Sequence, residues 1–132
     1  MAVAEKHKIQ SDIIPAIASG FCGGMSRTAG LCGALAGGIM ALGVLFGRNS
    51  SADAPKKIYA LSERLVRDFE KHFGSRKCSD LLGCDISTRA GEAVFEAKKL
   101  GKRRCLDITV KTSELVMQVL QNHDNIRHSL VK

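Results

Sequence analysis

FCGGMSRTAGLCGALAGGIMALGVLFGR, residues 21–48, is the stretch that decides the fold. Its part from Thr28 to Gly47 carries no charge, and six of those twenty residues are glycine. An apolar helix without a polar face is buried on all sides, and small residues let a neighbouring backbone approach it closely. We therefore expect a central helix at about residues 30–46, around which the other helices pack.

The same segment is long enough to cross a bilayer as a helix. Its glycines lower the helix propensity, and the arginines at its two ends, Arg27 and Arg48, define no orientation. We therefore favour a buried helix over a membrane span. The N-terminal residues have no signal-like apolar centre, which favours a cytoplasmic protein.

The chain has 132 residues, which fits one domain over residues 1–132. With five phenylalanines, one tyrosine and no tryptophan, the core must be built mainly from aliphatic side chains and glycine. No run of β-branched residues alternates with polar ones. We expect an all-α domain, a small bundle of about five helices, with flexible ends at residues 1–8 and 123–132.

Apolar spacing predicts four helices besides the central one. The first covers about residues 11–22, and its apolar face is formed by Ile9, Ile13, Ile17 and Phe21. The next ends at Gly74, and its apolar positions are Ile58, Leu61, Leu65, Phe69 and Phe73. The third covers about residues 89–100, and the residues expected to point inward are Ala90, Ala93, Ala97 and Leu100. The last covers about residues 104–122, and its inward residues are Cys105, Ile108, Leu115 and Val119.

Five cysteines lie at predicted helix ends or in loops, and none lies in the middle of a helix: Cys22, Cys32, Cys78, Cys84 and Cys105. Their number is odd, and in a reducing cytoplasm thiols are more often ligands or redox groups than disulfides. The segment that holds Cys78 and Cys84, residues 75–88, is predicted to be a loop with one helical turn at most.

Three of the cysteines are predicted to be thiolates. Cys32 and Cys105 fall in the first turns of predicted helices, where the helix dipole favours an anion, and Cys78 follows two basic residues. A thiolate attacks disulfides and binds soft metals. The alternative is that each cysteine is a small core residue.

Metal-ligand spacing adds little to this interpretation. The chain has no Cys-x-x-Cys pair, so neither a zinc ribbon nor a thioredoxin-like dithiol is indicated. The spacings also match no ferredoxin pattern. A cluster assembled from cysteines distant in the sequence stays open.

The net charge of +7, carried mostly after Asn49, leaves a different class of function open. A basic face can bind an acidic partner or nucleic acid. The most basic stretch, Lys98–Arg104, lacks the aromatic residues on which bases stack, so we do not expect nucleic acid. The alternative function is thus a non-enzymatic helical interaction module.

Taken together in order, several motifs resemble the redox-active protein family C-GCAxxG-C-C. They are Phe21-Cys22-Gly23-Gly24-Met25, Cys32-Gly33-Ala34-x-x-Gly37, Cys78-x-x-Leu81-Leu82-Gly83-Cys84-Asp85 and Cys105. The resemblance implies a small α-helical domain with a redox or metal-binding role, and it makes an iron–sulfur cluster or another soft metal a candidate cofactor.

Position by position, Cys32, Cys78 and Cys105 match the family's cysteines, and Cys84 matches one found in some members. The family's first cysteine has no counterpart, because residues 1–20 contain none. Cys22 either takes its place or is an independent ligand.

We therefore expect electron transfer or thiol redox chemistry, as a component of an oxidoreductase. We expect its cysteines to converge at one end of the central helix, with Cys84 nearby: Cys22, Cys32, Cys78 and Cys105. The candidate metal ligands are Cys22, Cys32, Cys78, Cys84 and Cys105, and the candidate catalytic residues are Cys32 and Cys105. A metal-free dithiol/disulfide couple is the other form of the same chemistry. The expected partners are a redox protein and a second copy of the chain, packed through Gly33-x-x-x-Gly37, rather than a membrane.

Overall fold

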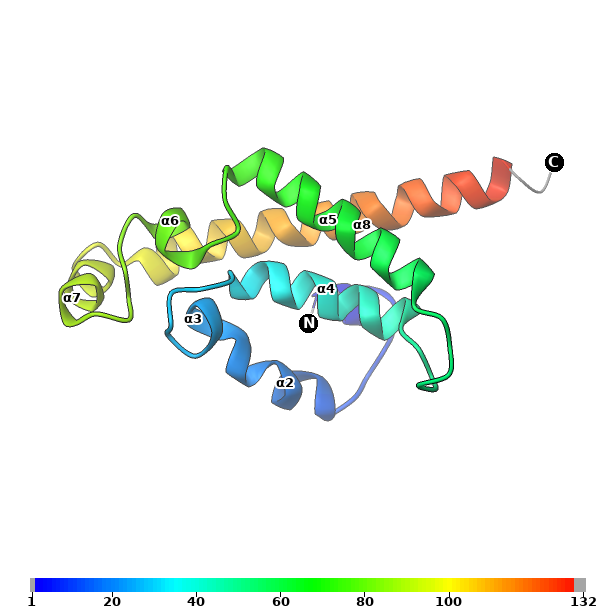
Figure 1. Ribbon diagram of the computed structural model, residues 1–132, viewed down its shortest axis with the longest axis horizontal. Helices are drawn as coiled ribbons and strands as arrows, with labels where there is room; N and C mark the ends of the chain where they lie inside the picture. Colours follow the sequence, from blue (N-terminus) through cyan, green and yellow to red (C-terminus); the bar gives the residue numbers. More distant parts are fainter. Residues whose placement is uncertain (1, 130–132) are drawn as a thin grey trace.

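The computed structural model describes the backbone of residues 2–129, and side chains for all of these except residues 2, 15 and 125–129. The described backbone is mostly α-helical, with one isolated antiparallel bridge between Leu31 and Lys77. The predicted all-α class is therefore confirmed. Figure 1 shows an elongated arrangement in which α8 runs along most of the length of the molecule, with α7 beyond its N-terminal end.

The helices occur in a simple order along the chain. They are α1 (Ala2–Lys6), α2 (Ile13–Ala18), the 3-10 turn η1 (Ser19–Phe21), α3 (Cys22–Met25), α4 (Gly33–Phe46), α5 (Lys56–Phe73), α6 (Cys78–Leu82), α7 (Arg89–Ala97), the π-helix η2 (Gly101–Cys105) and α8 (Leu106–Ser129). They exceed the expected number of about five because short helices form in segments predicted to be loops or tails.

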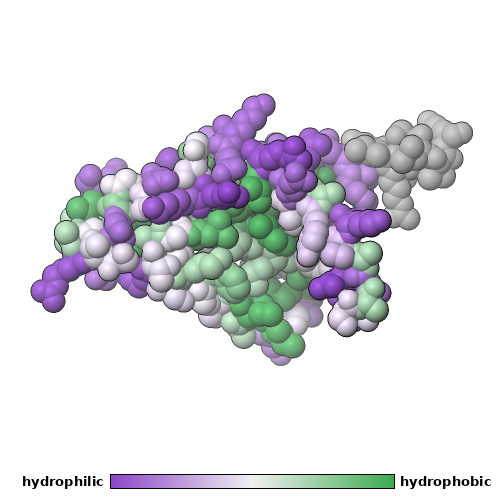
Figure 2. All heavy atoms as spheres, in the orientation of Figure 1, coloured by the Kyte–Doolittle hydropathy of each residue, from purple (hydrophilic) through white to green (hydrophobic). Residues whose placement is uncertain are grey.

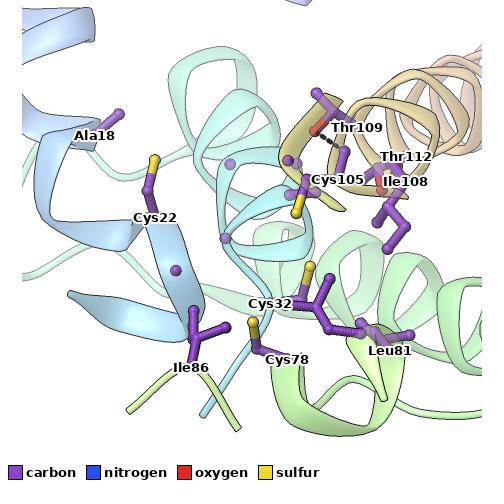
Figure 3. Close-up of a pocket in the computed structure, with 18 of the residues that line it drawn as sticks. Ala18, Cys22, Cys32, Cys78, Leu81, Ile86, Cys105, Ile108, Thr109 and Thr112 are labelled. Carbon is purple, nitrogen blue, oxygen red and sulfur yellow. Dashed lines mark hydrogen bonds between the residues drawn. The ribbon is translucent and has the colours of Figure 1, made fainter. Parts of the chain in front are cut away.

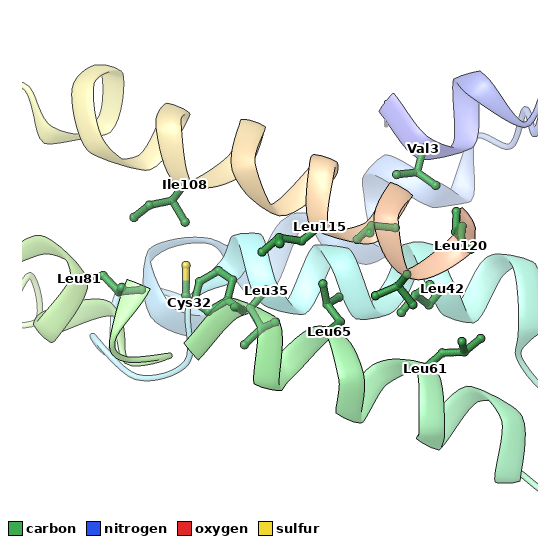
Figure 4. Packing of buried hydrophobic residues seen from close by; sticks show 13 residues of the cluster. Val3, Cys32, Leu35, Leu42, Leu61, Leu65, Leu81, Ile108, Leu115 and Leu120 are labelled. Carbon is green, nitrogen blue, oxygen red and sulfur yellow. The ribbon is translucent and has the colours of Figure 1, made fainter. Parts of the chain in front are cut away.

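Three long helices, α4, α5 and α8, pack against one another and build the core (Figures 1 and 4). The largest fully buried side chains come from these three helices alone: Leu35, Leu42, Leu65, Phe69, Ile108 and Val116. Each such side chain contributes about 1.5–3 kcal/mol through removal from water. The predicted apolar faces of α5 and α8 are therefore confirmed as core.

The apolar face predicted for the first helix is not buried. Ile13 and Ile17 on α2 are 68 % and 60 % exposed, and Figure 2 shows apolar side chains at the lower edge of the molecule, where α2 lies. The reason is that α2 ends at Ala18 and packs mainly against η1, which follows it. Spacing predicted the face of this helix but not whether another element covers it.

The inward face predicted for residues 89–100 is also wrong at three of its four positions, whereas Leu100 is half-buried. Ala90, Ala93 and Ala97 are exposed, whereas Gly91 is buried on the opposite side of α7. A Cβ atom at Gly91 would overlap the carbonyl oxygen of Asp85. Backbone contact through a glycine, rather than alanine packing, thus determines how α7 sits on the loop before it.

Among the described helices, none is long and apolar enough to span a membrane. The central helix α4 has 14 residues, which gives a length of about 21 Å, well short of a bilayer's hydrocarbon core of about 30 Å. The segments predicted to be flexible contain α1 at one end and the last turns of α8 at the other. Residues 1 and 130–132 lie outside the described residues.

Candidate functional site: a cavity lined by four cysteines

A cavity of about 820 Å³ lies where α3, α6, η2 and the N-terminal halves of α4 and α8 come together. Four of the five cysteines line it, each from a different part of the chain: Cys22, Cys32, Cys78 and Cys105. In Figure 3 the sulfur atoms of Cys32 and Cys105 point toward one another, with Cys78 and Cys22 on other sides of the same space. The predicted convergence of these four cysteines is therefore seen in the structure.

Cys22 is the most accessible of the four. It begins α3, directly after the η1 turn, and it is exposed to solvent. The next two residues, Gly23 and Gly24, have φ angles of +63° and +64°, which a residue with a Cβ rarely adopts. The glycine pair thus turns the chain sharply just after Cys22 and brings Gly24 against Cys78.

Cys32 and Cys78 are buried and held by their backbones. The amide of Cys32 donates to the carbonyl of Arg76 at 2.8 Å, and the amide of Cys78 donates to the carbonyl of Gly30 at 2.6 Å. These two hydrogen bonds flank the isolated bridge and join the segment before α4 to the segment before α6. Cys32 is the N-cap of α4, one residue before the predicted first turn, and Cys78 begins α6 rather than lying in a loop.

Cys105 is the last residue of the π-helix η2, immediately before α8. It is half-buried, and it faces the cavity as predicted. Its neighbour Arg104 donates from Nε to the carbonyl oxygen of Leu81 at 3.1 Å. This bond ties η2 to α6 and so fixes the position of Cys105 relative to Cys78.

Cys84 does not line the cavity. It is half-buried beside a small cluster formed by Ala29, Cys78 and Ile86. It still lies close enough to contribute to the electrostatics of Cys78 and Cys105. The structure therefore places it near the cavity cysteines, as expected, but outside the lining of the cavity.

The pKa values of the Cys78 and Cys105 thiols are raised, so the structure favours their protonated forms rather than the predicted thiolates. Burial raises the pKa of Cys78 to about 11, with a further contribution from the nearby Cys32, Cys105 and Cys84. Burial also raises the pKa of Cys105, followed by the effects of Cys32 and Cys22. The prediction failed because the basic residues beside them in sequence are exposed to solvent, whereas the thiols face an apolar space.

The described side chains do not form a ready metal site. Cysteine thiols are the ligands that iron–sulfur clusters and soft metals use. However, within the described part of the chain, no three Cys, His, Asp or Glu side chains are close enough together to hold a metal ion. The chemistry of the donors thus fits such a group, but their arrangement does not.

Small residues of α4 make room for the cavity, a role that the sequence did not reveal. A Cβ atom at Gly37 would have nothing within 4 Å, so this glycine opens directly onto the cavity. Gly33, by contrast, lies against the carbonyl oxygen of Phe21, 2.5 Å from where its Cβ would be. The close approach at Gly33 is therefore used within the chain, and the homodimer expected from Gly33 and Gly37 stays a prediction.

A helical domain whose cysteines come from distant segments to face one cavity brings together the sulfur atoms that thiol redox chemistry or soft metals can use. The chain belongs to the family described as "Putative redox-active protein (C_GCAxxG_C_C)", whose model matches residues 1–119. The resemblance seen in the sequence is thereby confirmed. No curated protein and no solved structure matches the chain.

Proposed function

We propose that this protein is a thiol redox protein in which the cavity cysteines cycle between two thiols and a disulfide. One observation carries the proposal: Cys22, Cys32, Cys78 and Cys105 come from separate elements and line one cavity. All five cysteines are free thiols in the structure.

Accessibility selects the thiol that reacts first. Thiol–disulfide exchange requires that the attacking sulfur reach the disulfide of the other molecule. Cys22 is exposed, whereas Cys32 and Cys78 are buried, so Cys22 is the entry point. Cys105 lines the same cavity and is half-buried rather than buried, so we assign it as the resolving thiol. The sequence-based choice of Cys32 as the catalytic partner of Cys105 stays a prediction.

The reaction balances as an exchange with a second disulfide. The thiolate of Cys22 attacks one sulfur of a partner's disulfide, which forms a mixed disulfide and releases one partner thiol. Cys105, after losing its proton, attacks the sulfur of Cys22 and releases the second partner thiol. Two electrons and two protons pass from the protein to the partner, and the protein keeps one disulfide.

Thiol titration after mild oxidation tests this function. Anaerobically purified protein treated with 2-hydroxyethyl disulfide should lose two titratable thiols per molecule, and peptide mapping should find a bond between cavity cysteines. Cys22→Ser should abolish the reaction, whereas Cys84→Ser, a matched change outside the cavity lining, should retain it. Five thiols that stay unreactive until the protein is denatured would instead indicate packing residues in a helical interaction module.

A second candidate is electron transfer through an iron–sulfur cluster or another soft metal bound by the same cysteines. The size of the cavity favours it, because about 820 Å³ is far more space than two thiols need. The described side chains are too far apart to hold such a group, which argues against this candidate. Anaerobically purified protein that is brown, with visible absorption lost in Cys32→Ala, would favour this candidate over the disulfide couple.

A further inference from the structure

A strongly basic segment forms the outer side of the cavity wall. Five of the seven residues in Lys98–Arg104 are basic and none is acidic. All five are exposed: Lys98, Lys99, Lys102, Arg103 and Arg104. Gly101, in the middle of the segment, lines the cavity together with Cys105, which follows directly. The positive charges therefore lie on the surface immediately behind a cavity cysteine.

The charges of this segment are not neutralised within the described part of the chain. Other arginines at this end of the molecule are paired: Arg27 lies 2.7 Å from Glu92, and Arg76 lies 3.3 Å from Glu70. No described carboxylate forms such a pair with a residue of Lys98–Arg104. Unpaired cations that are gathered on one surface raise the local concentration of anionic molecules and speed their association.

The backbone of the segment is also irregular. Lys99 has a φ angle of +51°, and residues 101–105 form a π-helix. Single π-helical turns occur frequently at functional sites. Here the turn joins the basic surface to Cys105, so a molecule bound to the cations lies next to a redox thiol.

We propose that Lys98–Arg104 is the docking site for an acidic surface on the redox partner protein, which thereby presents its disulfide at the cysteine cavity. This proposal rests on the thiol function proposed above. The electron balance is the same: the partner's disulfide is reduced to two thiols, while two cavity thiols form one disulfide. Docking changes only how often the partner's disulfide meets the cavity thiols.

A protein partner fits the segment better than a small anion or a nucleic acid. The basic side chains do not line the cavity, where only Gly101 and Cys105 of this region are found, so a small anion inside it would not meet them. The segment has no aromatic residue on which bases could stack, and Phe95 nearby is half-buried close to Gly101. An extended acidic protein surface matches exposed, unpaired cations over several residues.

Charge-matched disulfide peptides test the proposal. One probe is a synthetic peptide with a run of glutamates and one cysteine held as a mixed disulfide with 2-mercaptoethanol, and the other has glutamines in place of the glutamates. At low salt the full-length protein should reduce the glutamate peptide about tenfold faster or more. At about 0.5 M salt, where charges act over about 4 Å, the advantage should disappear.

Two variants separate docking from chemistry. Lys102→Glu with Arg103→Glu should remove the preference for the glutamate peptide while the rate with neutral 2-hydroxyethyl disulfide stays unchanged. Lys56→Glu with Lys71→Glu, which changes the charge equally on exposed positions of α5, should keep the preference.

The outcomes that overturn the proposal differ from those that overturn the thiol function. Equal rates with both peptides, alongside normal reaction with 2-hydroxyethyl disulfide, would reject the docking site alone. No reaction with any disulfide would reject the thiol function. A single-stranded oligonucleotide that binds more tightly than the glutamate peptide, and loses that binding in the Lys102→Glu, Arg103→Glu variant, would assign the segment to nucleic acid instead.

Discussion

Gly24 lies so close to Cys78 that a Cβ atom on the glycine would be 2.6 Å from the Cβ atom of Cys78. Its φ angle of +64° is also unfavourable for any residue with a side chain. The glycine therefore has two separate functions: it allows the turn after Cys22 and it leaves space for a buried cysteine. The position of one cavity thiol depends on the absence of a side chain elsewhere.

We predict that Gly24→Ala lowers the free energy of unfolding by about 2–5 kcal/mol, the sum of a positive-φ cost and an overpacking cost. Gly83→Ala is the matched control, because Gly83 has a φ angle of +67° but nothing within 4 Å of an added Cβ. It should cost only about 1–2 kcal/mol. Urea denaturation measures both, and equal losses would show that contact with Cys78 does not matter.

A second pair of glycines lies next to each other on α4 and should respond in opposite directions. Gly37 faces the open cavity, whereas a Cβ at Gly38 would meet Leu65 at 2.9 Å and Thr112 at 3.1 Å. Gly37→Ala should raise the free energy of unfolding by about 1 kcal/mol through helix propensity. Gly38→Ala should lower it by up to about 2 kcal/mol, because overpacking exceeds that gain. Thermal unfolding that shifts the same way in both variants would contradict this assignment.

The raised pKa of Cys78 predicts slow alkylation at neutral pH. Only the thiolate reacts, so the rate of modification by iodoacetamide should keep rising up to a pH of about 11, the pKa of Cys78, rather than level off near 9. Measuring the rate in the Cys84→Ser variant removes a neighbouring half-buried thiol and simplifies the mass-spectrometric reading. A Cys78 rate that is already maximal at pH 8 would show that the thiol is not held in an apolar environment.

The same shift predicts a loss of stability in alkaline solution. Between pH 9 and 11 the unfolded chain has released the proton of Cys78, whereas the folded protein still retains it. The unfolded state therefore binds fewer protons, and the free energy of unfolding falls as the pH rises through this range. Denaturation of wild type and Cys78→Ala at pH 8 and pH 10.5 should show a steeper fall for wild type. Parallel curves would indicate that Cys78 does not contribute.

Thr88 should stabilise the start of α7. Its side-chain oxygen accepts a hydrogen bond from the amide of Gly91 at 3.0 Å and donates one to the carbonyl of Asp85 at 2.8 Å. Thr88→Ala should lower stability by about 1 kcal/mol, whereas Thr88→Ser, which keeps the hydroxyl, should be nearly neutral. In Thr88→Ala the amide of Gly91 should exchange its hydrogen with solvent faster than in wild type. Unchanged protection of this amide would show that Thr88 does not cap α7.

The sequence predicted those parts of the fold that depend on local patterns. Leu61, Leu65 and Phe69 have helical spacing and are buried, and the uncharged glycine-rich segment does contain the central helix. Ile13 and Ile17 have the same spacing but remain exposed, because spacing shows which side chains share a face and not what covers that face. Long-range packing decides this, and it is not encoded in a short window of sequence.

The cysteines of the site could be found from the sequence, but their chemical state could not. The expectation that Cys22, Cys32, Cys78 and Cys105 come together, with Cys84 nearby, agrees with the four cysteines that line the cavity. The pKa of Cys78 and Cys105 was predicted in the wrong direction, because neighbours in sequence were taken as neighbours in space. Exposed cations screened by water have less effect than the burial of the thiol itself.

The two hydrogen bonds that join the segments of Cys32 and Cys78, together with the bond from Arg104 to Leu81, hold three of the four cavity cysteines on one frame. Cys22, the exposed one of the four, lies directly after η1. We therefore expect the shift in sulfur spacing that the proposed disulfide requires to fall mainly on the backbone at Cys22.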